Sequence, residues 1–177
     1  MKTRLILVLV GLLAWAALPL SPDALHAQSG AAPLVLFMNG GLWTWNEGEA
    51  APTPLVPSNV SSPALSPDGQ RIAYLAFSPI TLEAIEATGG IGGGALPSDI
   101  VIVDIQTGRS AAIATQPEDA SFFTEGREDS ALMRSAPVWS PDGQQVAWTE
   151  LHYPSLARDT NRLMVYDLAR GTQREVI

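Results

Sequence analysis

The residues that could do chemistry are few and widely spaced along this chain of 177 residues. The sequence has no cysteine, which excludes thiol catalysis, thiolate metal ligands and disulfide bonds. It also lacks the Gly-x-Ser-x-Gly, His-Glu-x-x-His and phosphate-loop patterns. A serine–histidine pair would have to use His152, because the other histidine, His26, lies in an N-terminal segment typical of export signals. No pattern assigns a serine to His152, so we predict no catalytic residues and interpret His152 as a surface hydrogen-bonding residue.

One acidic segment is a candidate cation site. Hard cations such as Ca²⁺ need several oxygen ligands, and carboxylates supply them. Five carboxylates occur close together in the sequence: Glu118, Asp119, Glu125, Glu128 and Asp129. The Asp-x-Asp spacing of calcium loops is absent, so the pattern favours a solvated acidic loop and predicts no metal site.

A glycine-rich stretch offers a loose match to a cofactor motif. Residues 90–95 fit the dinucleotide-binding fingerprint approximately. That fingerprint needs a preceding parallel strand and a helix that begins inside it. Here Pro97 and then a strand pattern follow, so we interpret the stretch as a flexible connection and predict no cofactor.

A sequence segment that occurs twice predicts the secondary structure of this chain. Residues 64–74 return as residues 138–148, with Ser-Pro-Asp-Gly-Gln identical in both copies. Proline presets φ, aspartate accepts backbone N–H groups, and glycine takes positive φ, so each copy predicts a tight turn between two strands. The turn residues are Ser66, Pro67, Asp68, Gly69, Ser140, Pro141, Asp142 and Gly143. A hairpin repeated in this way indicates a repeat fold.

A second type of hairpin alternates with the first. Residues 100–108 match residues 163–171, because each has an apolar strand, an aspartate and a glycine in the same order. Residues 42–48 form a weaker third copy. We call this type the outer hairpin and the Ser-Pro-Asp-Gly type the inner hairpin.

Together these motifs resemble the TolB-type β-propeller repeat. The resemblance spans residues 34–177 and implies an all-β fold, in which each blade is an antiparallel four-stranded sheet. Three outer and two inner hairpins make about two and a half blades, whereas closed propellers have roughly four to eight. We therefore expect an incomplete propeller that is the N-terminal piece of a longer one. The alternative is a ring that several copies close together.

Two long loops interrupt the repeats, at residues 78–99 and 116–134. Residues 82–87 could form a turn or two of helix. Phe122 and Phe123 stand side by side in the second, polar loop, where they either pack under the propeller or contact a partner. Because loops on a rigid scaffold often carry function, we assign them as possible partner contacts.

Two apolar stretches near the start of the repeats have structural interpretations. The continuous run Leu34–Met38 predicts a strand that is buried on both faces. Trp43 and Trp45 lie two residues apart on one face of the next strand. They could form a sugar-stacking platform, but packing between adjacent blades is the interpretation that we favour.

The N-terminus has the pattern of a secretory signal. Two basic residues precede an apolar run and a small residue at Ala27, which predicts a signal peptide over residues 1–27 and a leader over 28–33. An uncleaved membrane anchor is the alternative, but the run is short and ends near Pro19. Cleavage would change the net charge from −8 to −9, because it removes Lys2, Arg4 and Asp23. We predict a periplasmic or secreted protein that has no stable membrane anchor and does not bind nucleic acid.

These predictions define three hypotheses of function. The first is an exported, non-catalytic propeller module that binds protein or glycan at the cell envelope. The alternative is the N-terminal propeller portion of a prolyl oligopeptidase-type serine peptidase, whose catalytic domain is missing from this chain. The third is an exported sensor or structural module that binds through its long loops.

Overall fold

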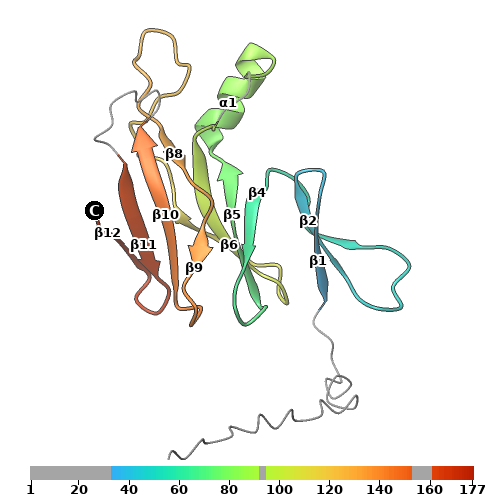
Figure 1. Ribbon diagram of the computed structural model, residues 1–177. Coiled ribbons are helices and arrows are strands. Elements are labelled where there is room, and N and C mark those ends of the chain that lie inside the picture. Colours follow the sequence, from blue (N-terminus) through green and yellow to red (C-terminus); the bar gives the residue numbers. More distant parts are fainter. Residues whose placement is uncertain (1–32, 92–94, 153–160) are drawn as a thin grey trace, which may run out of the picture. The chain divides into compact units, whose positions relative to one another are not determined.

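The computed structural model describes residues 33–91, 95–152 and 161–177. All of them fall within one compact unit, residues 32–177. The predicted signal peptide, and the leader up to residue 32, lie outside the described residues. The described residues form antiparallel sheets and one helix, which confirms the predicted all-β class (Figure 1). No helix in the described ranges is long and apolar enough to cross a membrane.

Sheet A is the first sheet and has three strands. They are β1 (Leu34–Met38), β2 (Gly41–Trp45) and β3 (Thr53–Val56), which are hydrogen-bonded in that order. The prediction that β1 is buried on both faces is wrong, because Leu34 is 58% and Phe37 51% exposed. The reason is that β1 is an edge strand, paired within the described residues with β2 alone.

Sheet B has the predicted four-stranded blade topology. Its strands are β4 (Ser61–Leu65), β5 (Arg71–Phe77), β6 (Ser98–Asp104) and β7 (Ser110–Ala114), each paired with the next in the chain. The β4–β5 connection is the first inner hairpin, and the β6–β7 connection is the second outer hairpin.

Sheet C repeats this order with its first strand in two pieces. Its strands are β8 (Leu132–Arg134), β9 (Val138–Trp139), β10 (Gln145–His152), β11 (Arg162–Asp167) and β12 (Thr172–Glu175). Both β8 and β9 pair with β10, so together they take the place that β4 has in sheet B. Pro137 lies between them, and proline has no N–H for a continuous ladder.

The two inner turns are held by the same hydrogen bonds. The Ser66 hydroxyl donates to the Asp68 carboxylate at 2.5 Å and accepts the Arg71 N–H at 2.9 Å. Ser140 donates to Asp142 at 2.5 Å and accepts the following Gln145 N–H at 2.9 Å. These serine hydroxyls, followed by backbone N–H groups, hold the pKa of both aspartates below its ordinary value.

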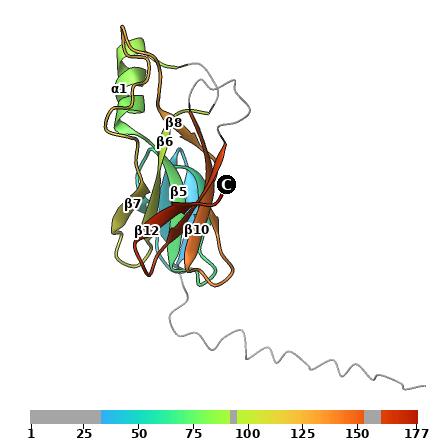
Figure 2. The ribbon, with the colours of Figure 1, turned by 90° about the vertical axis from the view of Figure 1, so that its left-hand side faces the viewer.

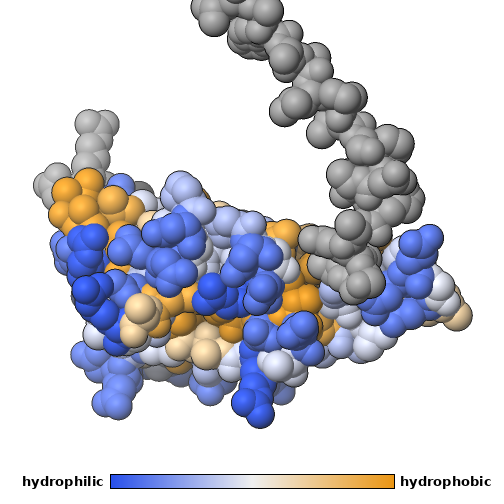
Figure 3. Space-filling view, turned by 90° about the horizontal axis from the view of Figure 1, so that it is seen from below, coloured by the Kyte–Doolittle hydropathy of each residue, from blue (hydrophilic) through white to orange (hydrophobic). Residues whose placement is uncertain are grey.

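Each inner turn is also tied to the outer hairpin of its own sheet. The Ile105 N–H donates to the Gln70 carbonyl at 2.9 Å, and the Leu168 N–H donates to the Gln144 carbonyl at 3.0 Å. The repeated Ser-Pro-Asp-Gly-Gln segment therefore holds the inner turn of each sheet against the outer hairpin of the same sheet. Figure 3 views the end of the molecule opposite α1, where apolar surface is interspersed with polar side chains.

Two apolar clusters join the three sheets. Between sheets A and B, the fully buried members include Leu42, Ile72 and Val103. Between sheets B and C, they include Ile100 and Trp148. The sheets therefore stack face to face in the order A, B, C, as propeller blades do.

Candidate functional site

The two long connections project from the same end of the sheets (Figures 1 and 2). The first contains α1 (Pro79–Thr88), which starts with proline at its first turn and ends at Gly89 with φ of 71°. Proline suits the first turn of a helix and glycine the left-handed position after it. The predicted helical turn is confirmed and is longer than residues 82–87.

Phe122 and Phe123 have different surroundings although they are adjacent. Phe122 is 3% exposed and packs in a small cluster with Ala84 of α1 and Ala131. Phe123 is 51% exposed, its ring meets that of Phe122 edge to face at 4.8 Å, and its N–H donates to the Asp129 carboxylate at 2.7 Å. Phe122 therefore joins the two connections into one unit, which we call the insert, and Phe123 lies on its surface.

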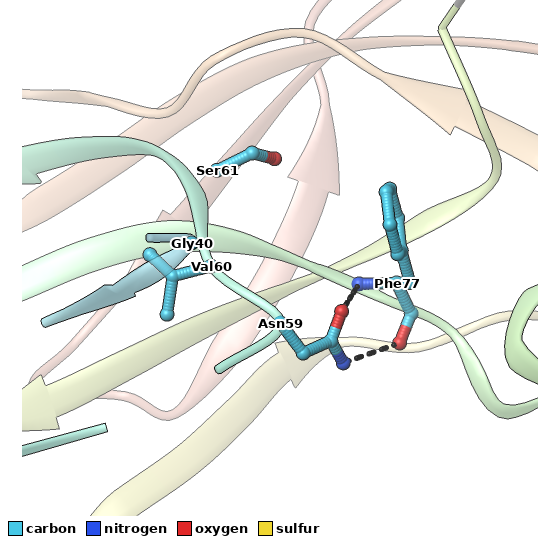
Figure 4. Close-up of a pocket in the computed structure, with 5 residues that line it drawn as sticks. All are labelled: Gly40, Asn59, Val60, Ser61 and Phe77. Atoms are coloured by element: carbon cyan, nitrogen blue, oxygen red, sulfur yellow. Dashed lines mark hydrogen bonds between the residues drawn. The ribbon is translucent and has the colours of Figure 1, made fainter. Parts of the chain in front are cut away.

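A small pocket lies beside this end, between sheets A and B (Figure 4). Its volume is about 260 Å³, and it is lined by Gly40, Asn59, Val60, Ser61 and Phe77. Both polar atoms of the Asn59 amide bind the Phe77 backbone, because the oxygen accepts the Phe77 N–H at 2.8 Å and the nitrogen donates to the Phe77 carbonyl at 3.1 Å. The walls are mainly apolar. Since small-molecule pockets usually span about 300–1,000 Å³, this one suits a single side chain.

A buried ionic cluster lies at the base of the insert, where sheets B and C meet. Arg134 of β8 is 6% exposed and donates to the Glu150 carboxylate at 2.7 Å. It also donates across the interface to the Ser98 carbonyl at 2.5 Å and the Thr115 carbonyl at 2.8 Å. Glu150, 4% exposed, accepts the Trp148 indole N–H at 3.0 Å. We call this group the Arg134 cluster.

Asp99, beside this cluster, has a buried carboxylate whose hydrogen bonds are incomplete. One oxygen, Oδ1, is buried without a hydrogen-bond partner in the described part of the chain, and lies 3.6 Å from an Arg134 nitrogen. Burial raises the pKa of the Asp99 carboxyl, and the nearby Arg134 charge partly opposes this. The buried surroundings therefore disfavour the ionised form of Asp99 more than water does.

The Arg134 cluster was not predicted from the sequence. The long loop predicted over residues 116–134 includes Arg134, whereas in the structure this residue belongs to β8 and is almost fully buried. A signal was present, because period-two alternation puts Glu150 on the same face of β10 as Val146 and Trp148. A charge on a buried face requires a partner, and Arg134 is that partner.

The remaining candidates stay separate from one another. His152 Nδ1 lies 3.3 Å from the Ser130 carbonyl, which agrees with a surface hydrogen-bonding role. No group of three or more metal-ligating residues occurs within the ranges that the structure describes. The eight inner-turn residues lie at the opposite end from the insert, where Ser66, Asp68, Ser140 and Asp142 bond within their own turns (Figure 1).

Comparisons with known proteins give partial matches. No family model matches the chain. It is 30% identical over 131 residues to dipeptidyl-peptidase 5 of Porphyromonas gingivalis, a match that covers 73% of this chain and 16% of that protein. The chain therefore spans about one sixth of the length of this relative.

Solved structures that resemble the chain include propeller proteins at low identity. TolB from Acinetobacter baumannii is 20% identical with a TM-score of 0.45, covering 82% of this chain and 30% of TolB. A puromycin-hydrolyzing peptidase from Mycobacterium tuberculosis is 19% identical with a TM-score of 0.46, covering 82% of this chain and 24% of the peptidase. The chain resembles these proteins at low identity and over less than a third of their lengths, which is consistent with a TolB-like repeat.

Proposed function

We propose that this chain is a non-catalytic propeller module that binds polypeptide in the periplasm or outside the cell. The observation that carries the proposal is the similarity over 131 residues to a protein named as a dipeptidyl-peptidase. That similarity favours a peptide over a glycan as the ligand. The signal-like N-terminal sequence supports the location.

The insert end offers features that suit a peptide. The apolar pocket of about 260 Å³ has room for one side chain, and its Asn59 amide already binds the Phe77 backbone. On the insert, Phe123 presents an exposed aromatic ring that the packing of Phe122 holds in place. Aromatic residues are enriched at the points where proteins bind proteins.

A titration with a defined peptide tests this proposal. The probe is fluorescein-labelled Ala-Phe-Ala-Phe, followed by fluorescence anisotropy, and the competitor is a chito-oligosaccharide. We expect saturable peptide binding that the sugar does not compete. Phe123→Ser should weaken binding several-fold, and the matched control Val138→Ser, at the opposite end and 62% exposed, should not. Absence of peptide binding, or binding of the sugar alone, would refute the proposal.

The second candidate is the propeller portion of a prolyl oligopeptidase-type serine peptidase. The same sequence match favours it, because the named relative is a peptidase and is much longer than this chain. In such enzymes the propeller admits substrate and carries no chemistry. Immunoprecipitating the native gene product and assaying cleavage of a dipeptidyl-aminomethylcoumarin separates the two candidates. Cleavage by a product longer than 177 residues favours the peptidase.

A further inference from the structure

A hollow between sheets B and C lies at the inner-turn end of the molecule, away from the insert. Its volume is about 270 Å³, and charged and apolar residues of sheet B line it together with Tyr166 and Leu168 from the outer hairpin of sheet C. It shares no lining residue with the pocket that contains Asn59. We call it the B–C hollow.

Three charged residues form a row across sheet B at this hollow. Arg71 of β5 pairs with Asp104 of β6, and the Asp104 N–H donates to the Arg109 carbonyl at 3.0 Å. All three line the hollow, so their side chains share the face of sheet B that packs on sheet C. No ion pair joins Asp104 to either arginine in the described part of the chain. The hollow therefore presents alternating charges that do not pair directly with one another.

Asp104 and Arg109 are able to bind a ligand. Oδ1 of Asp104 accepts the Thr107 hydroxyl at 2.7 Å and the Thr107 N–H at 2.8 Å, and these bonds hold the pKa of the carboxyl below its ordinary value. An ionised carboxylate has about four acceptor sites, so it has capacity for a further donor. Arg109 is exposed and belongs to none of the ion pairs found within the described ranges. Neither residue has to give up an ion pair to a ligand.

Arg71 is held in place by both sheets. Its Nη2 lies 3.6 Å from the Asp68 carboxylate and donates to the Gly143 carbonyl at 3.4 Å, and its guanidinium carbon lies 5.4 Å from the centre of the Trp139 ring. Because Asp68 balances the charge of Arg71, the two arginines and two aspartates at the hollow sum to zero. A ligand that carries both charges matches this arrangement better than a simple anion or cation does.

The rest of the lining is mainly apolar. Ile102 and Ile113 of sheet B and Leu168 of sheet C are half-buried and pack against the apolar cluster between the two sheets. Arg109 and Ala111 are exposed, so the hollow opens to solvent beside them. Since small-molecule pockets usually span about 300–1,000 Å³, the hollow suits a ligand no larger than one amino acid.

We propose that the B–C hollow binds a free α-amino acid with an apolar side chain. Opposite residues of neighbouring antiparallel strands have Cβ atoms about 4.5–5.5 Å apart. The acceptor Asp104 and the donor Arg109 are therefore adjacent, as the ammonium and carboxylate groups of an α-amino acid are. Asp104 accepts from the ammonium, Arg109 donates to the carboxylate, and the ligand side chain packs on the apolar lining. This inference goes beyond peptide binding and does not depend on it.

A titration followed by ¹H–¹⁵N NMR tests the proposal on the full chain. With L-leucine, we expect saturable shifts of the Gly108, Arg109 and Leu168 amides. Leucine amide lacks the carboxylate and N-acetyl-leucine lacks the ammonium. Each should bind about tenfold or more weakly than L-leucine, because each loses a charge-assisted hydrogen bond. Absence of saturable shifts at the hollow, or equal affinity for L-leucine and N-acetyl-leucine, would overturn the proposal.

Two substitutions test the assigned contacts, and the amide spectrum reports whether each variant is folded. Arg109→Gln should raise the dissociation constant of L-leucine about tenfold or more. The matched control Arg127→Gln removes the same charge from an exposed position of the insert and should not change it. Asp104→Asn keeps an acceptor for the Thr107 N–H and should reduce the preference for L-leucine over N-acetyl-leucine. Unchanged L-leucine binding by Arg109→Gln, or a preference that survives Asp104→Asn, would contradict the proposal.

Discussion

The A–B and B–C interfaces join similar sheets by different means. The A–B interface is an apolar cluster that includes Leu42, Ile72 and Val103, with one backbone hydrogen bond beside it, from the Val60 N–H to the Gly40 carbonyl at 2.8 Å. The B–C interface has its own apolar cluster and, in addition, hydrogen bonds at both ends. Arg134 donates to two carbonyls of sheet B at the insert end, and Trp139 donates to the Ala64 carbonyl nearer the inner turns.

This difference shows that apolar packing and buried hydrogen bonds have different roles in holding two sheets together. Apolar packing is non-directional and sets the affinity of two sheets. Buried hydrogen bonds are directional, and each is costly to break because its partner is left unsatisfied. The B–C interface should therefore be fixed in register and open only with the whole unit, whereas sheet A should separate more readily.

Removal of Arg134 should have the largest effect. Arg134→Ala removes the buried ion-pair partner of Glu150 and leaves only the more exposed Arg162, at 3.3 Å, and the loss of a buried partner costs about 3–5 kcal/mol. The free energy of unfolding from urea titration measures the effect. Arg170→Ala is the control, because that side chain is 77% exposed and its loss should change stability by less than about 0.5 kcal/mol. A loss below about 1 kcal/mol at Arg134 would contradict this account of the B–C interface.

Truncation of Leu42 to alanine in the A–B interface should cause the second-largest loss of stability. Leu42 is 0% exposed, and Leu→Ala changes at such sites cost about 2–5 kcal/mol. We expect about 3 kcal/mol, confined to sheet A. Amide exchange should therefore accelerate in β1–β3 and stay unchanged in β10 and β11. Equal acceleration in all three sheets would show that the A–B and B–C interfaces open together.

Loss of one interface hydrogen bond should have a smaller effect. Trp139→Phe keeps an aromatic ring under the Arg71 guanidinium, 5.4 Å above the Trp139 ring, but leaves the Ala64 carbonyl without its donor. The expected loss is about 1 kcal/mol in urea titration. Trp45→Phe is the matched control, since that indole bonds Glu49 within its own turn. If Trp45→Phe lost as much stability as Trp139→Phe, the hydrogen bond between Trp139 and Ala64 would have no special role in the B–C interface.

The stability that Asp99 contributes should change with pH in the opposite direction to the stability that the turn aspartates contribute. Burial raises the Asp99 pKa, so its contribution to stability is present below the pKa of the unfolded chain and is lost as pH rises through the raised value. As the pH rises from the unfolded-chain pKa through the raised pKa, the Asp99→Asn variant should therefore become more stable relative to the parent protein. Asp142→Asn should lose stability above the ordinary aspartate pKa, because hydrogen bonds lower its pKa. Parallel stability curves for the two variants in urea would refute this assignment.

The elements that follow from local turn chemistry were predictable from the sequence. Ser-Pro-Asp-Gly specifies its own hydrogen bonds, so both inner hairpins form where expected. The alternating strands around them follow from the same pattern. The fold class and the repeat could therefore be deduced before any contact between sheets was known.

Features that depend on distant contacts were not predictable in this way. Leu34–Met38 is as apolar as a central strand, yet it lies at an edge because no local signal specifies its neighbours. Phe122 and Phe123 are identical in type and differ only in which side of the insert they face. Arg134 is separated by 16 residues from Glu150, so its burial depends on a contact that periodicity alone does not give.

Native-state hydrogen exchange is the measurement that tests the different opening of the two interfaces most directly. Amides of β5, β6, β10 and β11 should share one opening free energy, because the Arg134 cluster joins sheets B and C. Amides of β1 and β2 should exchange through a separate opening of lower free energy. One common opening free energy for all three sheets would contradict the account, as would a sheet A that is as protected as the other two.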